Sequence, residues 1–167
     1  MKTKMTVILT ILALFALVFS SNCLAKGSKI NGSTNVTTNA KVQEVKTGKD
    51  AAVYVSNIQI IDSTLQGNLK VNTSSSTGKI DAGDGAVVNV ASFSAVKTKI
   101  KGSVDATMDA KVGDIKAKKN AVVNVATFQA NNSRFGGNVK LNLKAKVPGG
   151  IKAGKGSSVN IGSFIVR

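Results

Sequence analysis

Hydrophobic and polar residues alternate over short stretches in most of the chain beyond residue 30, and this pattern predicts β-strands. Val88 and Val90 flank a polar residue, as do Val104 and Ala106, so each pair points to one face of a strand. No stretch in this part repeats apolar residues at spacings of three and four, as an amphipathic helix would. The pattern therefore predicts an all-β protein.

The alternating segments are copies of one another. Residues 86–93, 121–128 and 157–164 read AVVNVASF, AVVNVATF and SSVNIGSF, and residues 51–58 are a diverged copy. Successive copies are 35, 35 and 36 residues apart, which places one inserted residue near residues 148–150. Repetition at a fixed period of this length is typical of repeat architectures.

The same period extends over the whole segment from residue 30 to residue 167. One glycine column recurs in all four units, at Gly32, Gly67, Gly102 and Gly137. We divide the chain into a repeat domain, a short preceding segment at residues 26–29, and a leader. The units of the repeat domain cover residues 30–64, 65–99, 100–134 and 135–167.

A single unit cannot bury its own apolar face, but stacked units can. We expect three short strands and three corners in each unit, with corners at Ala91-Ser92, at the glycine column and at residues 118–120. The predicted fold is a β-solenoid (parallel β-helix) of about four 35-residue repeats, with one or two turns in each repeat; the alternative is an antiparallel β-sandwich. Stacking predicts a core made by Val88, Val90, Phe93, Val123, Val125 and Phe128. It also predicts an amide ladder of Asn89, Asn124 and Asn160. A tight corner is expected at Gly67, Gly102 and Gly137.

The N-terminus has the layout of a secretory signal peptide. Basic residues come first, an apolar run follows over residues 7–19, and small residues stand at Cys23 and Ala25. We expect residues 1–25 to be removed by cleavage after Ala25, leaving no membrane span in the mature protein. The alternatives are an uncleaved membrane anchor and a lipoprotein carrying lipid on Cys23. The mature protein is expected to be secreted or at the cell surface, with the periplasm as the alternative location.

Composition excludes most catalytic chemistry. The chain has no His, and cleavage would remove its one Cys, so Ser-His-Asp, Cys-His and His-metal arrangements are impossible. The carboxylate pairs Asp81 with Asp84 and Asp105 with Asp109 are candidates for acid/base groups or Ca²⁺ ligands. The first pair falls in columns otherwise occupied by lysine, so relief of charge repulsion explains it better. We expect no enzyme activity, no cofactor and no metal.

The net charge is strongly positive, with 23 Lys and Arg against 8 Asp and Glu in the full chain. Several lysines recur at the repeat spacing, so stacking would align them as stripes that suit an acidic polysaccharide, lipopolysaccharide or extracellular DNA. The alternative is that they only keep a β-rich rod soluble. The candidate polyanion-binding residues are Lys41, Lys111, Lys146, Lys70 and Lys140.

The repeated segments and the export signal together resemble secreted bacterial β-repeat proteins, namely curlin-like functional-amyloid subunits and repeat adhesins. Segment 100–104 (IKGSV) also resembles rungs of bactofilins and other β-helices. The Ser, Gln, Gly and Asn spacing of the curlin repeat is missing here, so the resemblance concerns architecture. It implies a structural protein that associates with itself in a biofilm matrix, a fibre or a cell surface. The alternative function is a monomeric binding module for anionic polymers.

Overall fold

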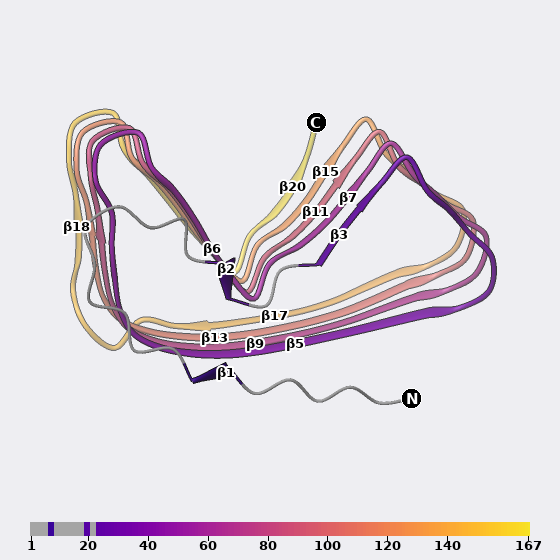
Figure 1. Cartoon of the computed structure of the whole chain (residues 1–167), viewed down its shortest axis with the longest axis horizontal. Coiled ribbons are helices and arrows are strands. Elements are labelled where there is room, and N and C mark those ends of the chain that lie inside the picture. The colour runs from indigo at the N-terminus through magenta and orange to yellow at the C-terminus, as the bar shows by residue number, and fades with distance from the viewer. Residues whose placement is uncertain (1–6, 9–18, 21–22) are drawn as a thin grey trace.

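The computed structural model describes residues 7–8, 19–20 and 23–167, and every regular element in them is a β-strand. The strands form four sheets in which all pairs are parallel, and strands in one sheet are about 35 residues apart in the chain. Figure 1 shows the chain tracing nearly the same path again and again. The β-solenoid prediction is confirmed, and the parallel pairing is incompatible with an antiparallel sandwich. Each repeat makes one complete turn, called a rung below.

The second rung shows the order of strands. A long strand, β9 (Leu69–Ala82), is followed by β10 (Val87–Val90), β11 (Phe93–Val96) and β12 (Lys99–Ile100). The chain then enters the next long strand, β13 (Val104–Ala117), directly beside β9. Inward and outward residues alternate along β13 except near Gly113, where two successive residues face outward.

The other rungs repeat this order. The first rung contains β5 (Thr34–Lys46), β6 (Ala52–Val55), β7 (Ile58–Ile61) and β8 (Thr64–Leu65), and β4 (Lys29–Ile30) precedes this rung and pairs with β8. The third continues from β13 through β14 (Val122–Val125), β15 (Phe128–Asn131) and β16 (Arg134–Phe135). The last contains β17 (Val139–Lys146), β18 (Ile151–Ala153), β19 (Ser158–Ile161) and β20 (Phe164–Val166).

The inserted residue interrupts the long strand of the last rung. Lys146 pairs with Lys111 at an offset of 35 residues, whereas Ile151 pairs with Ile115 at an offset of 36. The insertion therefore lies between β17 and β18, as predicted from the repeat spacing, and neither flanking strand loses its register.

Three short strands lie at the N-terminal end of the solenoid. These are β1 (Val7–Ile8), β2 (Phe19–Ser20) and β3 (Cys23–Lys26), which pair with β5, β6 and β7 respectively. The rest of the predicted signal peptide, residues 1–6, 9–18 and 21–22, lies outside the described residues. Among those that are described, no helix has the length and apolar character needed to cross a membrane.

Each rung has four corners rather than the three we expected. The corners at Ala91-Ser92, at the glycine column and at residues 118–120 are present. A further corner at Lys97 separates β11 from β12, and the expected separate strands around Val104 and Val112 are one continuous strand. The error arose because a 14-residue strand with a mid-strand break in alternation reads as two shorter strands.

Left-handed backbone conformations are stacked in columns at three of these corners. Ala91 has a φ of 49° and Lys97 also has a φ of 49°, a region that non-glycine residues rarely enter. The same conformation recurs at the equivalent positions of other rungs: Ser56, Ala126 and Gly162; Asp62 and Asn132; and Asp50, Gly85, Asn120 and Gly156. Two of these columns consist mainly of Asp, Asn and Gly, the residue types that adopt this conformation most readily. In the column of Ser56, Ala91 and Ala126, the stacking of rungs holds residues that rarely adopt it.

A hydroxyl group stabilises two of the corner columns. Ser92 follows Ala91 and donates from Oγ to the Val90 carbonyl at 3.2 Å. Thr98 follows Lys97 and donates from Oγ1 to the Val96 carbonyl at 3.0 Å. Side-chain hydroxyls commonly satisfy backbone groups in turns in this way. The same bond is made by Ser28, Ser63, Thr127, Ser133 and Ser163.

The cross-section is pinched into two lobes. Figure 1 shows the corner between β10 and β11 folding inward toward the middle of the long strands. Hydrogen bonds join the two there: Thr73 Oγ1 donates to the Ala91 carbonyl at 3.3 Å, and Ser56 Oγ donates to the Ser74 carbonyl at 3.1 Å. One core lies between β10 and the end of the long strand, and the other lies among β11, β12 and its beginning.

Aromatic side chains fill the second lobe. The rings of Phe93 and Phe128 are stacked with centroids 4.7 Å apart, and both side chains are completely buried. Phe135 approaches Phe128 at 6.1 Å from another strand of the lobe. The valine positions predicted for the core, Val88, Val90, Val123 and Val125, have no exposed surface either. Like residues therefore touch between rungs and give the solenoid a continuous core.

Glycine is required where neighbouring rungs approach closely. A Cβ on Gly67 would collide with the Gly32 carbonyl, and a Cβ on Gly113 would collide with the Gly78 carbonyl. In the predicted glycine column only Gly32 has a positive φ, at 91°. The later members of that column are therefore selected for close backbone approach rather than for an unusual backbone conformation.

Candidate functional site

The last rung leaves an open strand edge. Within the described part of the chain, β16, β17, β19 and β20 stand at the ends of their sheets, and β18 pairs only with β13. Each of them therefore presents unpaired backbone N–H and C=O groups on its outer side. We call the outer side of β16 to β20 the open edge.

Apolar side chains are uncovered along the open edge. Phe164 is 53% exposed, although Phe93 and Phe128 in the same column are fully buried. Three other apolar residues of the last rung are also exposed, namely Val139, Ile151 and Val166. Solenoids usually end in a polar cap that prevents such exposure, and this end has neither a capping helix nor a polar covering among the described residues. The arrangement is suited to pairing with another strand-bearing molecule.

The last rung is also the most basic. Residues 135–167 contain no acidic residue, but they contain six basic ones: Lys140, Lys144, Lys146, Lys152, Lys155 and Arg167. The first rung, residues 30–64, has three basic residues (Lys41, Lys46 and Lys49) and three acidic ones (Glu44, Asp50 and Asp62). The two ends of the solenoid therefore differ in charge.

One predicted lysine column contains a pair of adjacent like charges. Lys111 lies directly opposite Lys146 on neighbouring long strands, and both are exposed. Lys41 belongs to the same column but is separated from Lys111 by Ser76. These three lysines line an open groove on the long-strand face together with Asp109. The described structure thus brings two of the three lysines side by side.

The second lysine column alternates in charge. Asp105 lies between Lys70 and Lys140, and the three residues are in register on β9, β13 and β17. This column is not a continuous basic stripe, in contrast to our expectation from the lysine spacing. Reading the whole column rather than its lysines alone would have revealed the intervening aspartate.

The acidic candidates do not converge. Asp81 lies between Lys46 and Lys116, which is the charge-relieving position predicted for it. Asp105 and Asp109 both face outward on one strand, four residues apart and so about 13 Å from each other. In the described ranges no three His, Cys, Asp or Glu side chains are grouped so that they could hold a metal ion.

The amide ladder has a direction. Asn124 Nδ2 donates to Asn89 Oδ1 at 2.7 Å, and Asn160 Nδ2 donates to Asn124 Oδ1 at 2.8 Å. Each amide therefore points its nitrogen toward the N-terminal end and its oxygen toward the C-terminal end. The first rung places Tyr54 in this column, paired in register with Asn89. At the open edge, the Asn160 oxygen faces away from Asn124 and the third rung.

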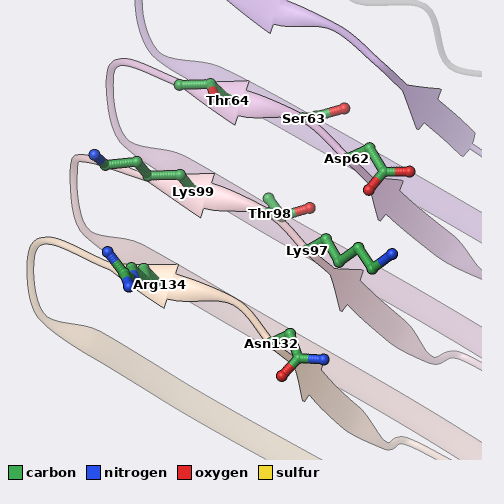
Figure 2. A pocket seen from close by; sticks show the side chains of 8 residues that line it. All are labelled: Asp62, Ser63, Thr64, Lys97, Thr98, Lys99, Asn132 and Arg134. Carbon is green, nitrogen blue, oxygen red and sulfur yellow. The ribbon is translucent and has the colours of Figure 1, made fainter.

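The corner that sequence reasoning missed forms a shallow pocket of about 310 Å³. Figure 2 shows that Lys97 and Lys99 extend to opposite sides of the chain, and that Asp62 lies on the Lys97 side. Arg134 lies on the Lys99 side. Because the charged groups diverge, they do not surround one small ligand. The signal for this corner was the recurrent Ser or Thr at residues 28, 63, 98 and 133.

The fold defines this chain as a β-solenoid repeat protein with one open, basic end. No protein-family model, curated protein or solved structure matches it.

Proposed function

We propose that this protein is an exported structural protein that associates with itself to build an extracellular matrix, a biofilm fibre or a cell-surface layer. It would act without enzymatic activity or a cofactor, and its resemblance to curlin-like subunits and repeat adhesins supports such a role. The observation that carries the proposal is the open edge, where Phe164 is 53% exposed beside a fully buried phenylalanine column.

Two physical terms favour association at this edge. Unpaired strand groups gain hydrogen bonds when another strand adds to the sheet. Apolar burial contributes about 25 cal/mol for each Å² removed from water, so the exposed apolar side chains add a further driving force. The outward residues of the long strands are mostly polar or charged, as along β13, which disfavours sideways association through that face.

Placing charge on the open edge should stop assembly without unfolding the protein. In the double variant Phe164→Lys/Val166→Lys, two side chains that are more than half exposed become cationic, so an incoming strand would have to bury two charges. We expect the wild-type protein to form large polymers in sedimentation and electron microscopy, and the variant to remain monomeric with an unchanged circular dichroism spectrum.

The matched control is Asn72→Lys/Ser74→Lys, which adds the same two charges to outward side-wall positions whose in-register neighbours carry no positive charge. It should polymerise like the wild type. The proposal is wrong if purified wild-type protein stays monomeric at high concentration, or if both double variants assemble normally.

A second candidate function is binding of an anionic polymer, and the juxtaposition of Lys111 and Lys146 favours it. Two cations at the inter-strand spacing repel each other, and a phosphate or carboxylate polymer lying along the face would relieve that repulsion. Acidic polysaccharide, lipopolysaccharide and extracellular DNA all offer such groups.

Reversing this pair should weaken polyanion binding. For Lys111→Glu/Lys146→Glu, we expect at least a tenfold loss of affinity for heparin or DNA. The slope of the logarithm of the binding constant against the logarithm of salt concentration should also fall by about two, because two ionic contacts are lost. The control Lys97→Glu/Lys99→Glu changes the net charge by the same amount, but at the corner pocket. Its affinity for heparin or DNA should fall less than that of the Lys111→Glu/Lys146→Glu variant. Binding measured by fluorescence anisotropy that is indifferent to salt would exclude this function.

A further inference from the structure

We infer that copies of this protein join head to tail, with the open edge of one copy pairing in register with the first rung of the next; this inference rests on the proposed self-association. The partner of the open edge is thus a second copy of this chain, at its N-terminal end. In such a junction β17, β19 and β20 would lie beside β5, β6 and β7 of the next copy, and all four sheets would continue across it.

The apolar columns continue across this junction. Phe164 would meet Ile58, which occupies the same column in the first rung. Val166 would meet Ile60 by the same reckoning, and Ile151 would meet Val45. Each contact therefore repeats a stacking that the solenoid already makes internally, so no new packing geometry is required.

The direction of the amide ladder selects head-to-tail joining. Asn160 presents its Oδ1 acceptor at the open edge, since its Nδ2 is used by Asn124. The residue of this column in the first rung is Tyr54, which brings no second amide oxygen against Asn160. Tail-to-tail joining would instead bring together two edges that each present this acceptor and no free amide donor from the ladder.

Charge selects the same orientation. A tail-to-tail junction would bring together two last rungs that each have six basic residues and no acidic ones. A head-to-tail junction places that rung against the first rung, in which three basic and three acidic residues balance. In the head-to-tail register Lys146 would still lie opposite Lys41, and Lys152 opposite Lys46. The comparison therefore concerns the net charge of the two rungs, and their overall repulsion is lower in the head-to-tail arrangement.

The acceptor end is covered in the full chain. Strands β1, β2 and β3 pair with β5, β6 and β7 on the side where the next copy would attach. Cleavage after Ala25 would remove β1, β2 and all of β3 except Lys26. The exported, cleaved protein is therefore the form in which both ends are free to pair.

A disulfide between copies tests the junction. Thr37 and Asn142 are exposed and belong to one outward column of the long strands, at its first and last members. Within one copy they are three rungs apart, or about 14 Å, which is too far for a disulfide. Across the inferred junction they would be neighbours at about 4.8 Å, which is within disulfide range.

The experiment uses Thr37→Cys/Asn142→Cys, expressed with its leader, exported, and checked for cleavage after Ala25 by mass spectrometry. Because that cleavage removes Cys23, the engineered thiols are the only ones present. Mild oxidation of the assembled protein should give a ladder of covalent dimers, trimers and higher oligomers on a denaturing gel. Thr37→Cys/Lys146→Cys, shifted four residues along the strand, should give none.

The outcomes separate this inference from the proposed function. Polymers that form without the covalent ladder would overturn the head-to-tail register while leaving self-association intact. Covalent dimers from Asn142→Cys alone would show tail-to-tail joining. Protein that never assembles would overturn the proposed function itself, and the inference with it.

Discussion

Replacing Phe128 with alanine should lower the free energy of unfolding by about 3–5 kcal/mol, the usual cost of deleting a phenylalanine from a packed core. Phe128 is fully buried, with ring neighbours Phe93 at 4.7 Å, Phe164 at 5.5 Å and Phe135 at 6.1 Å. Its removal would open a cavity inside the phenylalanine column, and the backbone ladders on both sides would hinder collapse around it. Urea unfolding followed by circular dichroism measures the loss.

Phe164→Ala is the matched control for this prediction. Phe164 occupies the same column, but it is 53% exposed at the open edge. Its loss should cost the monomer clearly less than the loss of Phe128, because less area is returned to water and no enclosed cavity forms. Equal losses for the two variants would mean that the two positions are equally buried, which would contradict the open edge. The measurement requires dilute protein, so that assembly does not bury Phe164.

Replacing Gly113 with alanine should be at least as damaging. Its Cβ would collide with the Gly78 carbonyl of the preceding rung, a backbone atom that cannot rotate away. The two rungs would have to separate locally, which breaks ladder hydrogen bonds on the long-strand face. We expect a loss of several kcal/mol, or failure to accumulate as folded protein.

Gly150→Ala tests whether this effect comes from the close approach. Gly150 has open space around its Cβ position and no positive φ, so alanine should be tolerated within about 0.5 kcal/mol. Gly48→Ala, in the first rung, has the same properties and should behave in the same way. Thermal unfolding of the three variants compares them directly. A Gly113→Ala protein as stable as these controls would contradict the rung-to-rung contact.

Much of the fold could be predicted because stacking imposes the same demand on equivalent residues of every rung. The Phe93 and Phe128 positions match in sequence because they touch in space. The inserted residue near Pro148 could be located by arithmetic alone, since the columns resume on either side of it. In a solenoid, residues one repeat apart in the sequence lie beside each other on neighbouring rungs, so equivalent residues are in contact.

The fourth corner was missed for a physical reason. Lys97 adopts a left-handed conformation without being glycine, because the neighbouring rungs and the Thr98 hydroxyl hold it there. The lysine itself therefore gave no sign of the turn, and the signal lay in Asp62 and Asn132 of the same column and in the Ser or Thr that follows each of them. Likewise, the alternation of inward and outward residues breaks at Gly113, where two successive residues of one long strand face outward. In the sequence, such a break looks like the end of a strand.

The candidate surfaces were harder to foresee than the core. Outward residues do not have to match between rungs, so Asp105 can stand between Lys70 and Lys140 without disturbing the fold. The charge of a face consequently depends on every member of its column. The apolar character of the open edge, in contrast, follows from the repeat, because the last unit has the same inward residues as the buried units.

The axial repeat of assembled fibres shows whether the stacked solenoid is the unit of assembly. Four rungs at the inter-strand spacing of about 4.8 Å give a rise of about 19 Å for each molecule added end to end. Helical reconstruction by electron cryomicroscopy, or fibre diffraction, should therefore show a molecular repeat of about 19 Å in addition to the strand spacing of about 4.8 Å. A fibre that advances by only about 4.8 Å per molecule would mean that the chains lie flat in single layers, and would contradict the stacked solenoid as the unit of assembly.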